Sequence, residues 1–195
     1  MKSKLSFKQV LLIVSTVGVM LSSLVVFFIV YAKDPVVKAP EILNNLGYGI
    51  PIRIRIPTIS VDAVVESVGT TTKNEMDVPK EIIHAAWFNL GPRPGDFGSA
   101  VIDGHFGWKE GRSAVFDNLN KLKIGDKIYI EEEDGVIISF TVRELKTYSD
   151  KENAYNVFNS SDNKAHLNLI TCGGVWNKAS KSYSNRIVVF ADKEI

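Results

Sequence analysis

Hydrophobic and polar residues alternate along the chain from about position 50 onward, which is the pattern of half-buried β-strands. In the stretch 52–56, isoleucine occupies every second position and arginine lies between, so one face of this strand should be buried. Pro57 follows directly and should end the strand. Further strands are predicted at 61–68, 100–104, 127–132, 136–145, 167–171 and 187–191.

A turn signal joins two of these strands. Residues 133–135 read Glu-Asp-Gly and lie between the strands 127–132 and 136–145, which predicts a hairpin. The acidic run 131–134 falls at the tip of this hairpin, so we interpret it as a solvated turn rather than as a calcium site.

One stretch has a helical pattern instead. Its apolar residues recur at a spacing near 3.6, at Val115, Phe116, Leu119 and Leu122. Short strands otherwise dominate and few helices intervene. The sequence therefore predicts a mainly β fold, a closed or nearly closed β-barrel with short helices.

An uncharged apolar run, rich in Val, Leu, Ile and Phe, occupies residues 10–31. As a helix, its 22 residues would span about 33 Å, whereas the hydrocarbon core of a membrane is roughly 30 Å thick. The alternative is a cleaved signal peptide, but such peptides have apolar regions of about 7–15 residues and a small-residue cleavage site. Ala32 alone is a poor cleavage site. We therefore predict an uncleaved transmembrane signal anchor at 10–32.

The charges around this run predict its orientation. Three lysines precede it in the tail 1–9, so the tail should stay cytoplasmic and the rest of the chain should lie outside a cell membrane crossed once. The segment 33–49 contains prolines and glycines and is predicted to be a stalk or linker, with a short helix around 41–46. The β-barrel domain is then expected at 50–195.

Composition limits the function classes. With 195 residues, one globular domain plus a membrane segment is expected. The net charge of +1 gives no electrostatic footprint for nucleic acid. The single cysteine excludes an intramolecular disulfide. No phosphate loop, His-Cys cluster or pair of catalytic carboxylates stands out, so no cofactor and no metal are expected.

Three residues at the ends of predicted strands carry the candidate chemistry. Cys172 follows an apolar strand and precedes Gly173-Gly174, His105 follows the strand 100–104, and Arg186 opens the strand 187–191. A thiolate can attack a carbonyl carbon, an imidazole can move a proton, and a guanidinium can stabilise an oxyanion. These residue types are the inventory of a cysteine acyl-transfer site.

The residues 168–172 also resemble a family motif. They match Thr-Leu-x-Thr-Cys, the nucleophile motif of the sortases, at four of five positions, with Asn168 in place of the first Thr. Sortases are membrane-anchored cysteine transpeptidases of bacterial surfaces, and the Gly-Gly after the cysteine is most similar to their class F. The resemblance covers roughly residue 50 to the C-terminus and implies an eight-stranded sortase-type barrel.

The resemblance implies a role for each site residue. Cys172 would be the nucleophile, His105 the general acid and base, and Arg186 the residue that stabilises the oxyanion and the substrate. Thr171 would direct a hydroxyl or a backbone donor toward the acyl group. Two other histidines compete with His105. His84 could be a packed or a loop residue, and His166 lies six residues before the cysteine, about 20 Å along a strand and too far for proton transfer.

The resemblance implies the reaction and its partners as well. A secreted protein with a C-terminal sorting signal of the Leu-Pro-x-Thr-Gly kind would be cleaved between Thr and Gly through a thioester. An amine of a peptidoglycan precursor would then take up the protein.

Three alternatives compete with this function. An L,D-transpeptidase would have an arginine two residues after its cysteine, where this chain has Gly174. A membrane-tethered, non-enzymatic β-domain that binds wall or protein ligands would have an unreactive thiol. A hydrolytic cysteine protease would transfer the acyl group to water.

Overall fold

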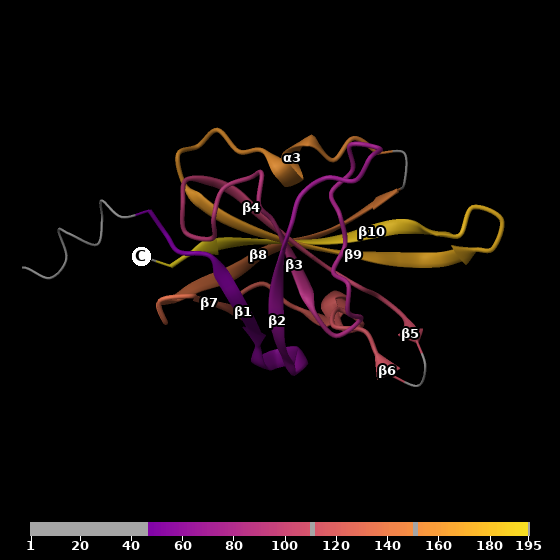
Figure 1. Cartoon of the computed structure of the whole chain (residues 1–195), viewed down its shortest axis with the longest axis horizontal. Coiled ribbons are helices and arrows are strands. Elements are labelled where there is room, and N and C mark those ends of the chain that lie inside the picture. The colour runs from indigo at the N-terminus through magenta and orange to yellow at the C-terminus, as the bar shows by residue number, and fades with distance from the viewer. Residues whose placement is uncertain (1–46, 110–111, 150–151, 195) are drawn as a thin grey trace, which may run out of the picture. The chain divides into compact units, whose positions relative to one another are not determined.

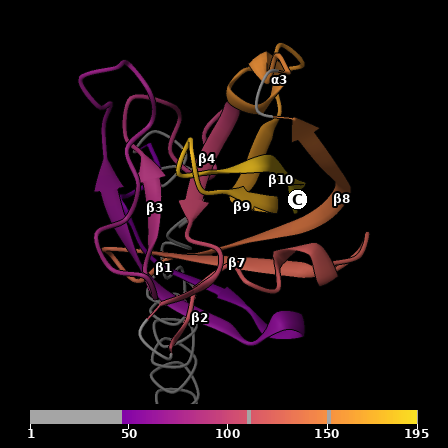
Figure 2. The same ribbon diagram turned by 90° about the vertical axis from the view of Figure 1, so that its right-hand side faces the viewer.

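The computed structural model describes residues 47–109, 112–149 and 152–194, and eight of its strands form one closed barrel (Figure 1). The barrel strands follow one another around the barrel in the order β1-β2-β3-β4-β9-β10-β8-β7 (Figure 2). They are β1 (Pro51–Ile56), β2 (Val61–Val68), β3 (Ala85–Phe88), β4 (Gly98–Gly104), β7 (Lys127–Glu132), β8 (Ile137–Ser149), β9 (Ala165–Asn177) and β10 (Ser182–Lys193). The smaller elements are η1 (Pro57–Ile59), β5 (Trp108–Lys109), β6 (Arg112–Ser113), η2 (Leu119–Lys121) and α3 (Tyr155–Phe158). The expected mainly β barrel with short helices is confirmed.

Two parallel strand pairs shape the connections of the barrel. Most neighbouring strands are antiparallel, but β2 pairs with β3 and β4 pairs with β9 in parallel. Parallel neighbours cannot be joined by a tight turn and need a longer connection. The chain therefore makes long excursions over residues 69–84 and 105–164, and both contribute to the cavity described below.

The barrel interior is filled by aliphatic and aromatic side chains from every barrel strand. In β1, Ile54 and Ile56 are fully buried, as the alternation predicts. Ile52 was expected on the same face but is 42% exposed. The reason is a register shift between Pro51 and Arg53 in the pairing with β7. An extra residue in a strand turns the preceding side chains to the other face.

A second apolar cluster lies on the outer surface of the barrel. It comprises Tyr148, Val157, Val188 and Phe190, with Ala154, Phe158 and Ile170 packed against it. The segment that carries α3 runs over this surface next to β4 (Figure 1). The outer faces of β8, β9 and β10 are thus covered beside the candidate site, and the covering segment becomes one wall of a cavity.

Two local expectations need correction. The stretch 115–122 is not an α-helix but a turn followed by the short η2, and its apolar residues Phe116 and Leu119 are fully buried in the barrel. The spacing therefore reflected insertion of a loop into the core. Strand β3 was not predicted at all, because Ala85 and Ala86 have weak strand propensity.

The acidic hairpin is formed as predicted, but it is not wholly solvated. The backbone N–H of Gly135 donates to the Glu132 carbonyl oxygen at 2.9 Å, and Gly135 has a φ of +84°. Glu132 itself is only 1% exposed, because it continues the inward parity of Ile128 and Ile130 in β7. Burial raises the pKa of this carboxyl above its usual value.

The expected membrane anchor at 10–32, the tail 1–9 and most of the stalk 33–49 lie outside the described residues. Within the described ranges, no helix has the length and apolar character needed to cross a membrane. The compact unit of the barrel includes Gly47, three residues ahead of the expected boundary. Tyr48 is part of it, since Arg93 Nη1 donates to its carbonyl oxygen at 2.6 Å.

Candidate active site

Strand register places the three predicted site residues near one another on the outer face of the barrel. Thr171 is buried in the barrel wall and Leu169 in the interior core, so Cys172 faces outward. Arg186 pairs directly with Cys172 across β9 and β10. On the other side of β9, Asp103 pairs with Ile170, and His105 lies two residues further toward the level of Cys172.

One cavity of about 430 Å³ brings these side chains together. Cys172, His105 and Arg186 all line it. Its apolar wall comes from the second cluster and the segment beside it, through Ala154, Val157, Phe158, Ile170 and Val188. The cavity therefore combines a nucleophile, a proton carrier and a fixed cation with an apolar surface.

The Cys172 thiol is half-buried in this cavity and favours its neutral form. Burial raises the pKa of Cys172 above its usual value, because water no longer stabilises the thiolate. The positive charge of Arg186 lowers the pKa, and the carboxylate of Asp103 raises it. The effect of burial on the pKa is larger than that of the arginine.

Arg186 is held by backbone groups rather than by a carboxylate. Its Nη1 donates to the carbonyl oxygens of Asn185 at 3.0 Å and of Tyr183 at 3.3 Å. In the part of the chain that the structure describes, no carboxylate lies within ion-pair distance of this guanidinium. Its charge is therefore not neutralised by a direct partner, and the side chain lines the cavity, where an oxyanion-stabilising group would be needed.

Among the described residues, one backbone group orients the His105 side chain. Its Nε2–H donates to the carbonyl oxygen of Pro79 at 2.8 Å, and Pro79 belongs to the excursion between β2 and β3. When the imidazole is neutral, this contact fixes the tautomer with the proton on Nε2. Nδ1 is then the nitrogen that can accept and return a proton.

Thr171 supports the histidine from inside the barrel. Its hydroxyl is fully buried and donates to the carbonyl oxygen of Gly104 at 2.6 Å. Gly104 directly precedes His105, and a Cβ there would overlap the Phe116 ring. One expectation was that this hydroxyl faces the acyl group, but it points to Gly104 instead. A direct contact between Thr171 and an acyl group would therefore have to come from the backbone.

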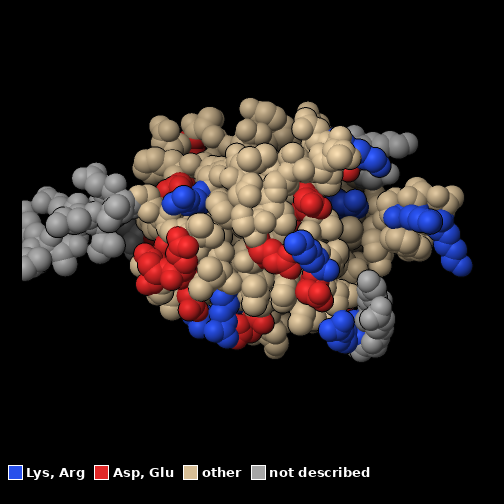
Figure 3. Space-filling model, viewed as in Figure 1, with Lys and Arg blue, Asp and Glu red and all other residues tan. Residues whose placement is uncertain are grey.

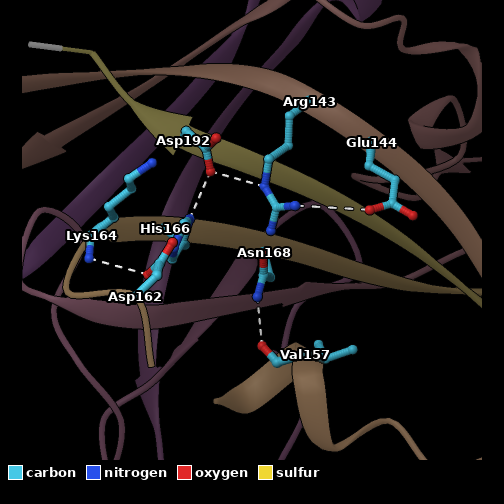
Figure 4. Close-up of polar contacts among 8 residues, drawn as sticks. All are labelled: Arg143, Glu144, Val157, Asp162, Lys164, His166, Asn168 and Asp192. Carbon is cyan, nitrogen blue, oxygen red and sulfur yellow. Dashed lines mark hydrogen bonds and ion pairs between the residues drawn. The ribbon is translucent and has the colours of Figure 1, made fainter. Parts of the chain in front are cut away.

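Asn168, which departs from the family motif, fastens the cavity wall. Its Nδ2 donates to the carbonyl oxygen of Val157 at 2.6 Å, and Val157 belongs to α3 (Figure 4). The side chain is 1% exposed, and its Oδ1 has no hydrogen-bond partner among the described residues. The amide therefore ties β9 to the segment that covers the second apolar cluster.

The two competing histidines contact carboxylates away from Cys172. His166 lies between two carboxylates, with its Nδ1 2.6 Å from Asp192 and its Nε2 2.9 Å from Asp162 (Figure 4). His84 Nδ1 lies 2.8 Å from Glu66 Oε1. Neither lines the cavity with Cys172.

A second hollow of about 450 Å³ adjoins His105. Its aromatic wall contains Phe106, Tyr183 and Trp176. The Tyr183 ring packs edge to face against both others, with its centroid 5.3 Å from that of Phe106 and 5.1 Å from that of Trp176. Lys80 and Ile82 line it as well. Because both hollows share His105, a second molecule could approach the imidazole without crossing the first cavity.

Sequence reasoning missed one charged residue of the site. Asp103 lines the cavity with Cys172 and Arg186. Burial raises its pKa to about 6, and the charges of His105 and Arg186 partly oppose that rise. The signal in the sequence was a single carboxylate inside an otherwise apolar strand, two residues before the histidine.

Known proteins share this fold. The family model of the Sortase domain matches residues 54–194. Sortase A from Corynebacterium diphtheriae is 26% identical, with a TM-score of 0.57, over 75% of this chain and 61% of that chain. Sortase C-1 from Actinomyces oris is 24% identical, with a TM-score of 0.57; the match covers 74% of this chain and 75% of that chain. A Clostridium perfringens sortase D5 transpeptidase is 23% identical, with a TM-score of 0.54; the match covers 74% of this chain and 79% of that chain. Comparison with curated proteins gives no match.

The chain belongs to the sortase family, because the family model matches well over half of it. The sortase structures share the barrel fold of this chain. The chain spans 61% of the length of the Corynebacterium sortase A chain.

Proposed function

We propose that this chain is a membrane-anchored sortase that cleaves a sorting signal of the Leu-Pro-x-Thr-Gly kind between Thr and Gly. It transfers the protein to an amine of a cell-wall precursor. The observation that carries the proposal is the single cavity lined by Cys172, His105 and Arg186. Sequence membership in the sortase family supports the same chemistry.

In the first half-reaction, the Cys172 thiolate attacks the carbonyl carbon of the signal's threonine. The resulting oxyanion lies against the Arg186 guanidinium, whose charge has no direct carboxylate partner in the described residues. The protonated His105 gives its proton to the leaving glycine nitrogen, the C–N bond breaks, and a thioester on Cys172 remains.

In the second half-reaction, an amine attacks the thioester carbonyl and loses a proton to His105. The C–S bond breaks, a new amide forms, and the thiolate is regenerated. The hollow beside Phe106 and Tyr183 reaches His105 from outside the peptide cavity, so it offers the amine a route to the thioester. If water attacks instead, the same site acts as a hydrolytic protease.

The apolar wall of the cavity supports a signal with a Leu-Pro start. Ile170, Val157 and Val188 offer surface for the leucine and proline side chains, and such burial is worth about 25 cal/mol per Å². The Thr end would then lie at Cys172. A binding module without catalysis would need no thiol at that place.

The finer assignment to class F rests on Gly173-Gly174. Both glycines also have a local structural cause. Gly174 has a φ of +78°, and a Cβ on Gly173 would lie 2.9 Å from the Ile187 side chain. The pair therefore permits close approach of β10 next to the nucleophile, whichever class the chain belongs to.

The membrane anchor is proposed from the run 10–31 and the lysines that precede it. A protease added to intact protoplasts should digest the domain that follows the anchor. Protection in intact protoplasts, with digestion only after lysis, would reverse the proposed orientation.

The transpeptidase itself is tested with the purified full chain in detergent. It is incubated with a library of sorting-signal peptides and several amines, and the products are identified by mass spectrometry. We expect cleavage after Thr and a product joined to the amine, both lost in Cys172→Ala. Peptide release by Cys172→Ala at the wild-type rate would refute the proposal.

A further inference from the structure

Asp103 is an acidic residue in a place where the reaction has no evident use for one. It lies on the outer face of β4, in register with Ile170 and two residues ahead of His105. It lines the cavity that also contains Cys172 and Arg186. Its side chain makes no ion pair with any described residue.

Six other charged or titratable groups line the same cavity as Asp103. They are Glu75 from the β2–β3 excursion, His105 after β4, Tyr148 on β8, Glu152 after β8, Cys172 on β9 and Arg186 on β10. On the remaining flank, β3 presents Ala86, which is uncharged. Glu75 and Glu152 are exposed, and Glu152 pairs with Lys146 at 3.2 Å. Asp103 is therefore the one half-buried carboxylate among the described residues of this cavity.

Burial makes the charge of Asp103 effective at short range. A charge in a partly dehydrated cavity acts more strongly on its neighbours than one in water. Two cationic groups, Arg186 and protonated His105, attract the ionised carboxylate, and the Cys172 thiolate is repelled by it. An ionised Asp103 therefore offsets Arg186 and disfavours the thiolate.

We propose that Asp103 is a positioning residue of this site, whose carboxylate counterbalances Arg186 and holds Cys172 in its neutral form when the cavity is empty. It acts through the thiol and not on the substrate. A neutral thiol reacts slowly with oxidants and other electrophiles, so the arrangement protects the chain's single cysteine between turnovers. The inference rests on the proposed function only in taking Cys172 as the nucleophile.

The test is the pH dependence of alkylation of Cys172 by iodoacetamide in the full chain. Because the chain has one cysteine, the rate reports this thiolate alone. In Asp103→Asn, the midpoint should move to lower pH and the rate at pH 7 should rise several-fold. Asp103→Glu keeps the charge and should restore most of the wild-type profile. Glu152→Gln is the matched control, since it removes an exposed carboxylate of the same cavity and should leave the midpoint in place.

In the wild type, the plot of alkylation rate against pH should show a second inflection near pH 6, where Asp103 itself titrates. Asp103→Asn should lose that inflection. A wild-type midpoint in an Asp103→Asn protein with native circular dichroism would overturn the proposal. So would an equal shift in Glu152→Gln. Alkylation needs no sorting peptide, so this outcome is separate from whether the chain cleaves one.

Discussion

Cys172 and Arg186 are fourteen residues apart in the sequence but lie directly opposite each other in the antiparallel pair of β9 and β10. Side chains paired in this way project from the same face, with Cβ atoms about 4.5–5.5 Å apart. The hairpin between the two strands thus fixes the cation next to the nucleophile by backbone hydrogen bonds. This pairing makes Arg186 the first residue to test after the cysteine.

Replacing Arg186 should damage the chemical step. Loss of one oxyanion-stabilising group typically costs about 2.7–4 kcal/mol, or roughly a hundred- to a thousandfold in kcat. We expect Arg186→Ala to fall at least that far. Arg186→Lys should recover only part of the activity, because lysine keeps the charge but loses the planar fork. The exposed Arg53, paired with Asp62 on the barrel, is the control, and Arg53→Ala should keep its kcat/KM. A near-normal Arg186→Ala would remove the oxyanion role.

The three histidines should separate clearly. His105→Ala should be severely impaired, because no other described imidazole lines the cavity with Cys172. His84→Ala should keep most of its activity. His166→Ala should keep kcat at low temperature but lose stability, because the buried imidazole and its contacts with Asp162 and Asp192 would be lost. Kinetics on one peptide and urea titrations check both. A dead His166→Ala that is still folded, beside an active His105→Ala, would show that the wrong histidine was assigned.

Thr171 should matter through Gly104 rather than through substrate. Thr171→Val preserves the shape but removes the donor to the buried carbonyl oxygen of Gly104. An unsatisfied buried acceptor costs about 1–3 kcal/mol, and the backbone that carries His105 would shift. We therefore expect kcat to fall more than KM changes, while Thr171→Ser should stay close to wild type. A rise in KM alone would instead mean that the hydroxyl binds the substrate.

Asp103 should lower the free energy of unfolding at neutral pH. Its pKa is raised from 3.8 to about 6, so the folded state prefers the protonated carboxyl. The favourable contribution is complete below about pH 4 and is lost as the pH rises through about 6. Two pKa units correspond to roughly 3 kcal/mol at most. In urea titrations, Asp103→Asn should gain stability relative to wild type between pH 4 and 7, with a constant difference above. A difference independent of pH would contradict this account.

Much of the fold and site could be predicted because their signals are local. The alternation in β1 and β2, the Glu-Asp-Gly turn and the lone cysteine are all visible within short windows. Charge follows the same rule. In Figure 3, basic and acidic side chains are interspersed over the described part of the face shown, without a broad basic field.

The remainder depends on contacts between distant segments. β3 forms because β2 and β4 flank it, although its Ala85-Ala86 start is a poor strand signal. Ile52 is exposed because of a register shift that is set by β7. Asp103 belongs to the site only because β4 and β9 pair in parallel. None of these relationships can be seen in a window of ten residues.

The most direct measurement of the central claim is the intact mass of the full chain after mixing with a Leu-Pro-x-Thr-Gly peptide and no amine. A thioester mechanism predicts a mass increase equal to the peptide up to its threonine, less one water. Tryptic mapping should place it on Cys172, hydroxylamine should remove it, and Cys172→Ala should lack it. Peptide cleavage without any adduct on Cys172, and undiminished in Cys172→Ala, would contradict the account.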